Sequence, residues 1–200
     1  MYSVAQQKKI VSLYAKEMEI IKLRVQSIMS ASSNIGYLTP AVEFQALQLR
    51  KIIEQIVLSS LIVNSDIYLN YYNRLGRDWN IRFICRDIRQ INPEYLPIAA
   101  NNMPEMETIE NAPERTISED DLLGIHEKMG RLLHSPNPFA SEIDYRAESK
   151  YIKVSISRII NFLSVHTIKL YGENDFLFVI MEARNKDGHV GINWFTKVEE

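Results

Sequence analysis

Apolar residues recur at helical spacing along most of the chain. Between residues 3 and 30 they occupy two interleaved series with a seven-residue repeat, in which only Gln7 is polar: Val4, Val11, Met18 and Val25, then Gln7, Tyr14, Ile21 and Ile28. Such a stripe is typical of a long amphipathic helix that packs in a bundle. The same criterion predicts four further helices, over residues 41–63, 66–91, 118–134 and 145–171, with Gly76 dividing the stretch 66–91.

Local signals indicate where these helices begin and end. Thr39 and Pro40 are suited to the N-cap and first turn of the second helix, and Ser118 is suited to the N-cap of the fourth. Pro93 disfavours helical geometry at Asn92 and ends the third. The last helix is expected to continue to Gly172 and places His166 at a core position, because its apolar face advances by four and three residues: Ile152, Ile156, Ile159, Leu163, His166 and Leu170.

The period changes near the C-terminus. Residues 176–181 form a continuous apolar run, residues 185–188 read Asn-Lys-Asp-Gly, and apolar and polar positions alternate from Val190 to Val198. This order predicts a β-hairpin over residues 175–198. The expected fold is mainly α: one domain over residues 1–200, consisting of a helical bundle with a C-terminal two-stranded hairpin.

Residues 92–117 sustain no period and are predicted to form an acidic loop. The stretch from 92 to 121 holds eight acidic residues against one arginine, whereas the whole chain has a net charge of −2. A loop of this length in a compact domain tends to be functional or disordered. We therefore expect a mobile segment that lies over the arginine-rich stretch described below, or that docks a protein partner.

Composition narrows the class of protein. The 200 residues are 46% hydrophobic and 24% charged, and Cys85 is the only cysteine, which excludes an internal disulfide. The N-terminus shows no apolar segment of a secretory signal, and the longest apolar stretch, residues 56–63, is too short to span a bilayer. The sequence also lacks the common nucleotide, hydrolase and zinc motifs. These features predict a cytoplasmic protein without a membrane span, a metal or another cofactor.

One candidate catalytic site lies at the end of the fourth helix. Helical geometry places His134 on the same polar side as Glu127 and Arg131. An imidazole transfers protons near neutral pH, and a guanidinium binds phosphate in a bidentate manner, so this group could cleave RNA without a metal. The structural alternative is that His134 bonds the last carbonyls of the helix while Arg131 and Glu127 form an exposed ion pair.

Two segments of the chain carry a family resemblance. The segment LRKIIEQIVL (residues 49–58), with the later GRLLH (residues 130–134), resembles the helical HEPN superfamily. The chain also resembles a group of uncharacterised bacterial proteins that share LRKI, INP and LLHxxNPF segments, here at residues 49–52, 91–93 and 132–139. HEPN proteins are small, commonly dimeric helical bundles, and many are metal-independent ribonucleases of toxin–antitoxin and antiphage systems. The resemblance implies His134 as the acid–base group and Arg131 or Lys128 as the phosphate ligand.

A second candidate site is rich in arginine. Residues 74–89 contain five arginines and no lysine, with aromatic residues between them. Arginine next to an aromatic ring suits phosphate binding and base stacking in single-stranded RNA. The structural alternative is that Asp78 pairs with Arg82 while the aromatic residues belong to the core. The candidate nucleic-acid ligands are Arg74, Arg77, Trp79, Arg82, Arg86 and Arg89.

Two classes of function follow. The first is an RNA-directed protein, with possible endoribonuclease activity, that acts in a bacterial or phage conflict system. The second is a non-catalytic helical interaction module that acts as a regulator or inhibitor. In either class we expect a homodimer whose contact includes the first helix or the helix end at His134, because the stripe at residues 4–28 is wide enough to serve both the core and a partner.

Overall fold

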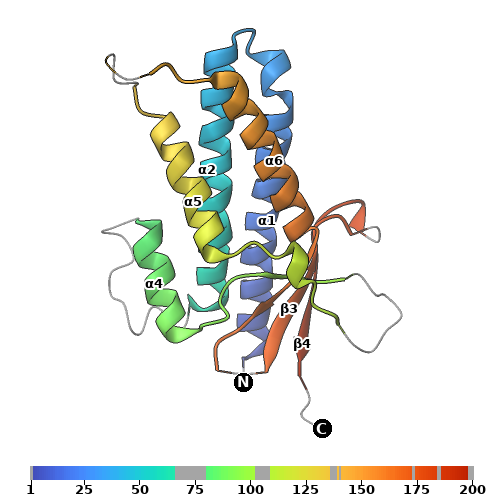
Figure 1. Ribbon diagram of the computed structural model, residues 1–200. Coiled ribbons are helices and arrows are strands. Elements are labelled where there is room, and N and C mark those ends of the chain that lie inside the picture. The colour runs from blue at the N-terminus through green and yellow to red at the C-terminus, as the bar shows by residue number, and fades with distance from the viewer. Residues whose placement is uncertain are drawn as a thin grey trace.

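The computed structural model describes residues 2–65, 80–101, 109–135, 139, 141–172, 174–183 and 186–197. Four long helices stand side by side (Figure 1): α1 (Val4–Asn34), α2 (Leu38–Val63), α5 (Glu119–Leu132) and α6 (Tyr145–Leu163). A shorter helix, α4 (Ile81–Ile91), lies near the end of the bundle where the chain begins. None of the described helices is long and apolar enough to cross a membrane.

A small antiparallel sheet lies at the same end of the bundle. Its strands are β1 (Ile98–Ala99), β2 (Val165–Lys169), β3 (Asp175–Ile180) and β4 (Gly191–Thr196), in that spatial order. The predicted hairpin corresponds to β3 and β4, which are joined by a turn with positive φ at Asp187 and Gly188. The expected two strands are thus part of a four-stranded sheet, and the fold is mainly helical with a small antiparallel sheet.

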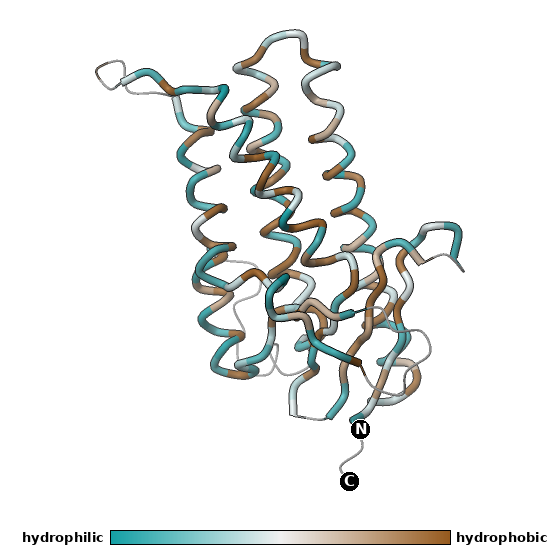
Figure 2. Tube along the Cα trace, turned by 45° about the vertical axis from the view of Figure 1, so that its right-hand side comes forward, coloured by the Kyte–Doolittle hydropathy of each residue, from teal (hydrophilic) through white to brown (hydrophobic). Residues whose placement is uncertain are grey.

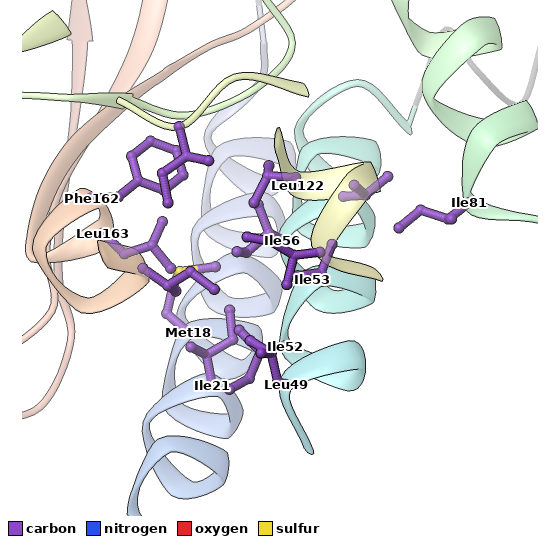
Figure 3. Packing of buried hydrophobic residues seen from close by; sticks show 14 of the residues in the cluster. Met18, Ile21, Leu49, Ile52, Ile53, Ile56, Ile81, Leu122, Phe162 and Leu163 are labelled. Atoms are coloured by element: carbon purple, nitrogen blue, oxygen red, sulfur yellow. The ribbon is translucent and has the colours of Figure 1, made fainter. Parts of the chain in front are cut away.

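The core surrounds α2, which packs against α1, α5 and α6. Leu49, Ile52, Ile53 and Ile56 of this helix are fully buried, and Figure 3 shows them between side chains of α1, α5 and α6. The other helices carry hydrophobic and hydrophilic positions in turn (Figure 2), as expected for helices that bury one face. The bundle therefore obtains its apolar contacts from side chains at helical spacing, as the sequence predicted.

The apolar stripe of α1 packs against other parts of the same chain. Tyr14, Met18, Ile21 and Ile28 are buried, while Val4 is exposed. The four buried side chains face the core that α1 shares with α2. The homodimer remains a prediction, but the stripe that suggested it is already covered by the protein's own core.

One predicted helix start differs from the structure and another agrees with it. The second helix begins at Leu38 after the N-cap residue Tyr37, which makes no side-chain capping bond, so Thr39 is inside the first turn. Ser118 does cap α5 and accepts a hydrogen bond from the Asp121 N–H. Within residues 66–91 the described part is α4, capped by Asn80, while residues 66–79 lie outside the described residues.

The predicted helix over residues 145–171 is two elements. Helix α6 ends at Leu163, and residues 165–169 form β2. His166 is buried as expected, but it lies in a strand, where its Nε2 accepts a hydrogen bond from the Tyr14 hydroxyl at 2.8 Å. Its Nδ1 is 2.8 Å from the Leu163 carbonyl and donates to it. The two bonds connect the end of α6 and the sheet to α1.

The described parts of the predicted acidic loop are structured. Ile98 and Ala99 pair with β2, Ala100 forms a bridge with Asn111, and Pro113–Arg115 form a short 3₁₀ helix, η1. The Arg115 guanidinium donates to the Ala100 carbonyl, the Asn101 side chain and the α6 carbonyl of Asn161. Residues 98–101 and 109–117 thus include a strand, a bridge and a short helix where a loop was expected, and residues 102–108 lie outside the described residues.

Removing residues 99–112 is expected to destabilise the fold by more than about 2 kcal/mol, because several backbone hydrogen bonds and three buried alanines are lost together. Urea denaturation followed by far-UV circular dichroism measures this difference. A variant with wild-type stability would mean that the segment does not contribute to the sheet. The substitution Arg146→Ala, at an exposed position, provides a control with an expected change within about 0.5 kcal/mol.

Candidate functional site

The side chains predicted to form a site at the end of α5 are only partly together. Arg131 is 3.2 Å from Glu127, as the spacing predicted, but Glu127 also accepts from Arg82 of α4 at 2.6 Å. The His134 side chain is exposed and makes no hydrogen bond or ion pair with the described residues; its backbone N–H donates to the Arg131 carbonyl. The described part of the chain therefore provides no partner that would orient His134 for proton transfer.

Lys128 points away from this group. Its ammonium is 3.1 Å from Glu148 of α6 and 3.9 Å from the centre of the Tyr151 ring. One residue along an α-helix turns the side chain by about 100°, which separates Lys128 from Glu127. Lys128 thus links α5 to α6 and does not approach His134.

The arginines of α4 are mostly neutralised. Arg82 pairs with Glu127 and Arg89 pairs with Glu119, both on α5, and Arg86 pairs with its neighbour Asp87 at 2.9 Å. The acidic partners of Arg82 and Arg89 thus lie on α5 and not on the predicted loop, whose Glu94 pairs with Lys169 and whose Glu114 pairs with Arg115. The predicted cover of the arginine helix by the loop is therefore wrong for the described residues. Arg74, Arg77 and Trp79 lie outside the described residues.

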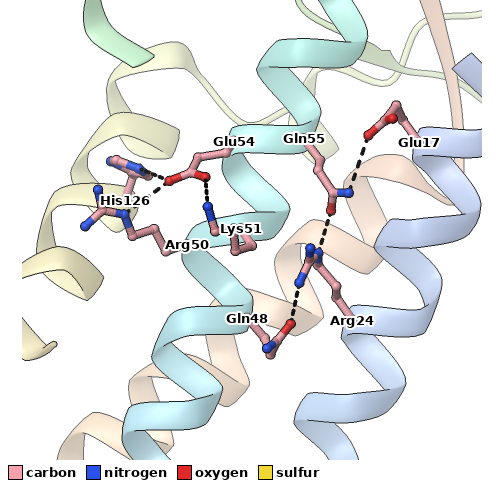
Figure 4. Close-up of polar contacts among 8 residues, drawn as sticks. All are labelled: Glu17, Arg24, Gln48, Arg50, Lys51, Glu54, Gln55 and His126. Carbon is pink, nitrogen blue, oxygen red and sulfur yellow. Dashed lines mark hydrogen bonds and ion pairs between the residues drawn. The ribbon is translucent and has the colours of Figure 1, made fainter. Parts of the chain in front are cut away.

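A different polar cluster lies between α2 and α5 (Figure 4). Glu54 Oε1 is 3.1 Å from His126 Nε2 and 3.2 Å from Arg50 Nε, and its Oε2 is 2.7 Å from Lys51 Nζ. The imidazole is 13% exposed and the carboxylate 24%. We refer to Arg50, Lys51, Glu54 and His126 as the Glu54 cluster.

The electrostatics of the Glu54 cluster strongly favour the carboxylate. The hydrogen bond with His126 is the main reason why the pKa of Glu54 falls to about 2, and Lys51 and Arg50 lower it further while burial raises it. Glu54 is consequently ionised at every physiological pH. A permanent negative charge at this position is the feature that holds an imidazole and two cations together.

Close packing of the helices places Arg50 in the cluster. A Cβ atom on Gly130 of α5 would lie 2.8 Å from Arg50 Nη1. Glycine therefore leaves the space that the guanidinium occupies against α5. Gly130 lies one turn after His126, so both residues are on the side of α5 that faces α2.

The Glu54 cluster has the groups needed for proton transfer next to a phosphate. In the neutral imidazole the nitrogen bonded to the carboxylate carries the proton, so His126 Nε2 donates to Glu54 and Nδ1 remains a proton acceptor. Nδ1 makes no hydrogen bond with the described residues. Arg50 and Lys51 are partly exposed, and their charges can bind a phosphate oxygen near the Glu54 carboxylate.

Sequence patterns pointed to only part of this cluster. Arg50 and Glu54 have the four-residue spacing of an ion pair on one helix, and this spacing predicts their contact but no contact with another helix. His126 lies 72 residues from Glu54, and no local pattern connects the two. The sequence feature that could have indicated the cluster is the segment at residues 49–58, which carries the family resemblance and contains three of the four residues.

A second polar network connects α1 with α2 (Figure 4). Arg24 donates to Gln55 at 2.9 Å and to Gln48 at 2.6 Å, and Gln55 in turn donates to Glu17 at 3.4 Å. This network contains no histidine or other group that titrates near neutral pH. Its hydrogen bonds fix the relative position of the two helices, and we assign it a structural role.

Among the described residues there is no group of three or more His, Cys, Asp or Glu side chains that could hold a metal ion. A shallow groove of about 300 Å³ lies between the end of α4 and the turn from β2 to β3, and it includes Asn92, Glu94 and Lys169.

Comparisons with protein-family models, curated proteins and solved structures gave no match to this chain. The Glu54 cluster is therefore the candidate functional site.

Proposed function

We propose that this chain is an RNA-directed protein that cleaves RNA without a metal at the Glu54 cluster. The observation that carries the proposal is the His126–Glu54 pair at 3.1 Å, with Arg50 and Lys51 on the same carboxylate. Three of the four residues belong to the segment that resembles the HEPN superfamily, and Arg50 lies against Gly130 of the second resembling segment. The proposed acid–base group is thus His126 and not His134.

A charged group between two helices requires an explanation other than stability. Well-packed apolar side chains at a half-buried helix contact are often at least as stable as an ion pair. Glu54 nevertheless brings three potential proton donors to one point of the α2–α5 contact. A functional requirement for an oriented imidazole accounts for this arrangement.

The chemistry follows from the two ring nitrogens of His126. Nδ1 takes the proton of an RNA 2′-hydroxyl, and the 2′ oxygen attacks the adjacent phosphorus while the bond to the 5′ oxygen breaks. The proton is then returned to the 5′ oxygen, which leaves a 2′,3′-cyclic phosphate and a 5′-hydroxyl. Glu54 holds the ring in place through its hydrogen bond, and Arg50 and Lys51 balance the charge that develops on phosphate.

This reaction is tested with a labelled oligoribonucleotide in excess EDTA. We expect the wild-type chain to cut it and to leave the all-deoxy oligonucleotide intact, because the attacking hydroxyl is then absent. His126→Ala should lower the rate at least about a hundredfold, the usual contribution of a positioned general base. If the wild-type chain does not cut RNA, or if His126→Ala cuts it equally well, the proposal is wrong.

The alternative is a non-catalytic interaction module, and one surface favours it. Residues 25–42, at the turn between α1 and α2, contain no charged side chain. Met29, Tyr37 and Leu38 are exposed there, and the Tyr37 side chain is 80% exposed. Exposed apolar side chains without neighbouring charge are typical of protein contacts. The EDTA experiment separates the two functions, because the interaction module would not cut RNA.

A further inference from the structure

The two faces of the sheet differ in their surroundings. The inner face packs on α1, through the contacts of Tyr14 with His166 and of Tyr2 with Trp194. Side chains alternate along each strand, so the neighbours of these residues lie on the outer face. In rows across β2, β3 and β4, the outer face carries Lys169, Phe176 and Phe195, then Thr167, Phe178 and Asn193.

Three phenylalanines form a contiguous aromatic surface on the outer face. Phe176 and Phe195 are directly opposite each other on β3 and β4, and their rings are 5.7 Å apart and inclined by only 19°. Phe178 meets the Phe195 ring edge-on at 6.4 Å and is itself buried beside Ala100 and Val165. Phe195 is 41% exposed. The two nearly parallel rings of Phe176 and Phe195 therefore reach the surface, and the buried Phe178 ring packs against Phe195.

Positive and polar groups surround these rings. Lys169 is the cross-strand neighbour of Phe176. Lys197, two residues after Phe195 and directly after β4, donates its backbone N–H to the Asn174 carbonyl, so the antiparallel pairing continues to it. No described strand residue on the outer face is acidic. Glu94 reaches Lys169 from outside the sheet, but both side chains of this pair are about half exposed, so a phosphate can replace the carboxylate at little cost.

We propose that the outer face of the sheet binds single-stranded RNA, with bases stacked on Phe176 and Phe195 and phosphates held by Lys169 and Lys197. Aromatic rings on a sheet, next to cations, match the alternation of bases and phosphates along an unpaired strand. An apolar protein partner fits less well, because Lys169, Thr167 and Asn193 share rows with the rings. The inference rests on the proposed RNA-directed function and adds a binding surface separate from the Glu54 cluster, which lies between α2 and α5 (Figure 1).

Fluorescence anisotropy with a short oligoribonucleotide that is 2′-O-methylated throughout tests this surface. The methyl groups block the 2′-oxygens, so binding is measured whether or not the protein cleaves RNA. We expect Phe195→Ala, and separately Phe176→Ala, to weaken binding about tenfold, the usual contribution of one stacked base. Lys169→Gln should weaken binding and lower the slope of log affinity against log salt by about one, because one phosphate contact is lost.

Phe83→Ala is the matched control, since Phe83 is an exposed phenylalanine beside Arg86 on α4. It should bind like the wild type. Unchanged binding in the Phe195→Ala variant, or weakening only in the Phe83→Ala variant, would overturn the inference, and so would a wild-type chain that does not bind the oligonucleotide. Phe195 is partly exposed, so its variant is expected to fold even if Phe176→Ala does not. Cleavage that depends on His126 but not on Phe195 would leave the proposed function standing and remove only this surface.

Discussion

Lowering the pH from 7 to 4 is expected to remove about 3 kcal/mol from the free energy of unfolding, because His166 stays neutral in the folded chain. Burial lowers the pKa of His166 to about 4, although the hydrogen bond to the Leu163 carbonyl favours the charged form. The unfolded chain takes up a proton near pH 6.5, whereas the folded chain does not until about pH 4. The stability is complete above pH 6.5 and is lost as the pH falls through this window.

Urea denaturation at half-unit steps from pH 7.5 to 4 measures this loss. His166→Gln is the control, because a glutamine oxygen can accept the hydrogen bond of the Tyr14 hydroxyl and the side chain does not titrate. Its stability should vary much less over the same range. Glu54 contributes in the same direction only below about pH 4.5, because its pKa is lowered and not raised. A wild-type stability that is constant from pH 7 to 4.5 would contradict this account of His166.

Replacing Phe162 by alanine is expected to lower the free energy of unfolding by about 3–5 kcal/mol, which is the usual cost of a cavity of this size. Phe162 is fully buried in the last turn of α6, and Figure 3 shows it in the cluster with Met18 and Leu163. Helices α1, α2 and α6 are all held by this cluster, so they cannot easily collapse into the space.

The matched control for this cavity is Ile160→Ala, two residues earlier in α6. Ile160 is 45% exposed, and its replacement should change stability by less than about 1 kcal/mol. Chemical denaturation of both variants at pH 7 gives the comparison. Equal losses in the two variants would mean that Phe162 is not part of the core.

The long helices could be predicted because each has an apolar face that repeats over several turns. The boundary between α6 and β2 could not, because helical steps of three and four continue through Leu163, His166 and Leu170. The same stretch also has the two-residue alternation of a strand, with His166 and Ile168 on the buried side. Neither glycine nor proline marks the change, and only Ser164 separates the two elements.

Strand β1 was missed for a related reason. It contains two residues, which is too short for any period, and its position depends on pairing with β2 across a separation of more than 60 residues. Four prolines nearby suggested a loop. The position of β1 is determined by tertiary contacts, because Ala99 and Ala100 are buried only when the rest of the sheet is present.

The candidate site likewise depends on tertiary contacts that the sequence pattern of one helix does not show. Helical spacing correctly placed Arg131 beside Glu127, but that pair lies on the exposed side of α5. His126 and Gly130 occupy the side that meets α2, and which side is buried depends on the whole bundle. The pattern of the single helix α5 therefore indicated His134 as the candidate. The packing of α5 against α2 indicates His126 instead.

The most direct test of this account compares two histidines of the same segment in one experiment: His126→Ala and His134→Ala are each assayed for cleavage of a labelled oligoribonucleotide in EDTA. The Glu54 cluster predicts that the first variant loses at least about 99% of the wild-type rate and that the second keeps it. Of these two histidines, His126 is oriented by a carboxylate, whereas His134 has no such partner among the described residues. Circular dichroism at the same protein concentration confirms that both variants are folded. A rate that falls in His134→Ala and persists in His126→Ala would contradict the account.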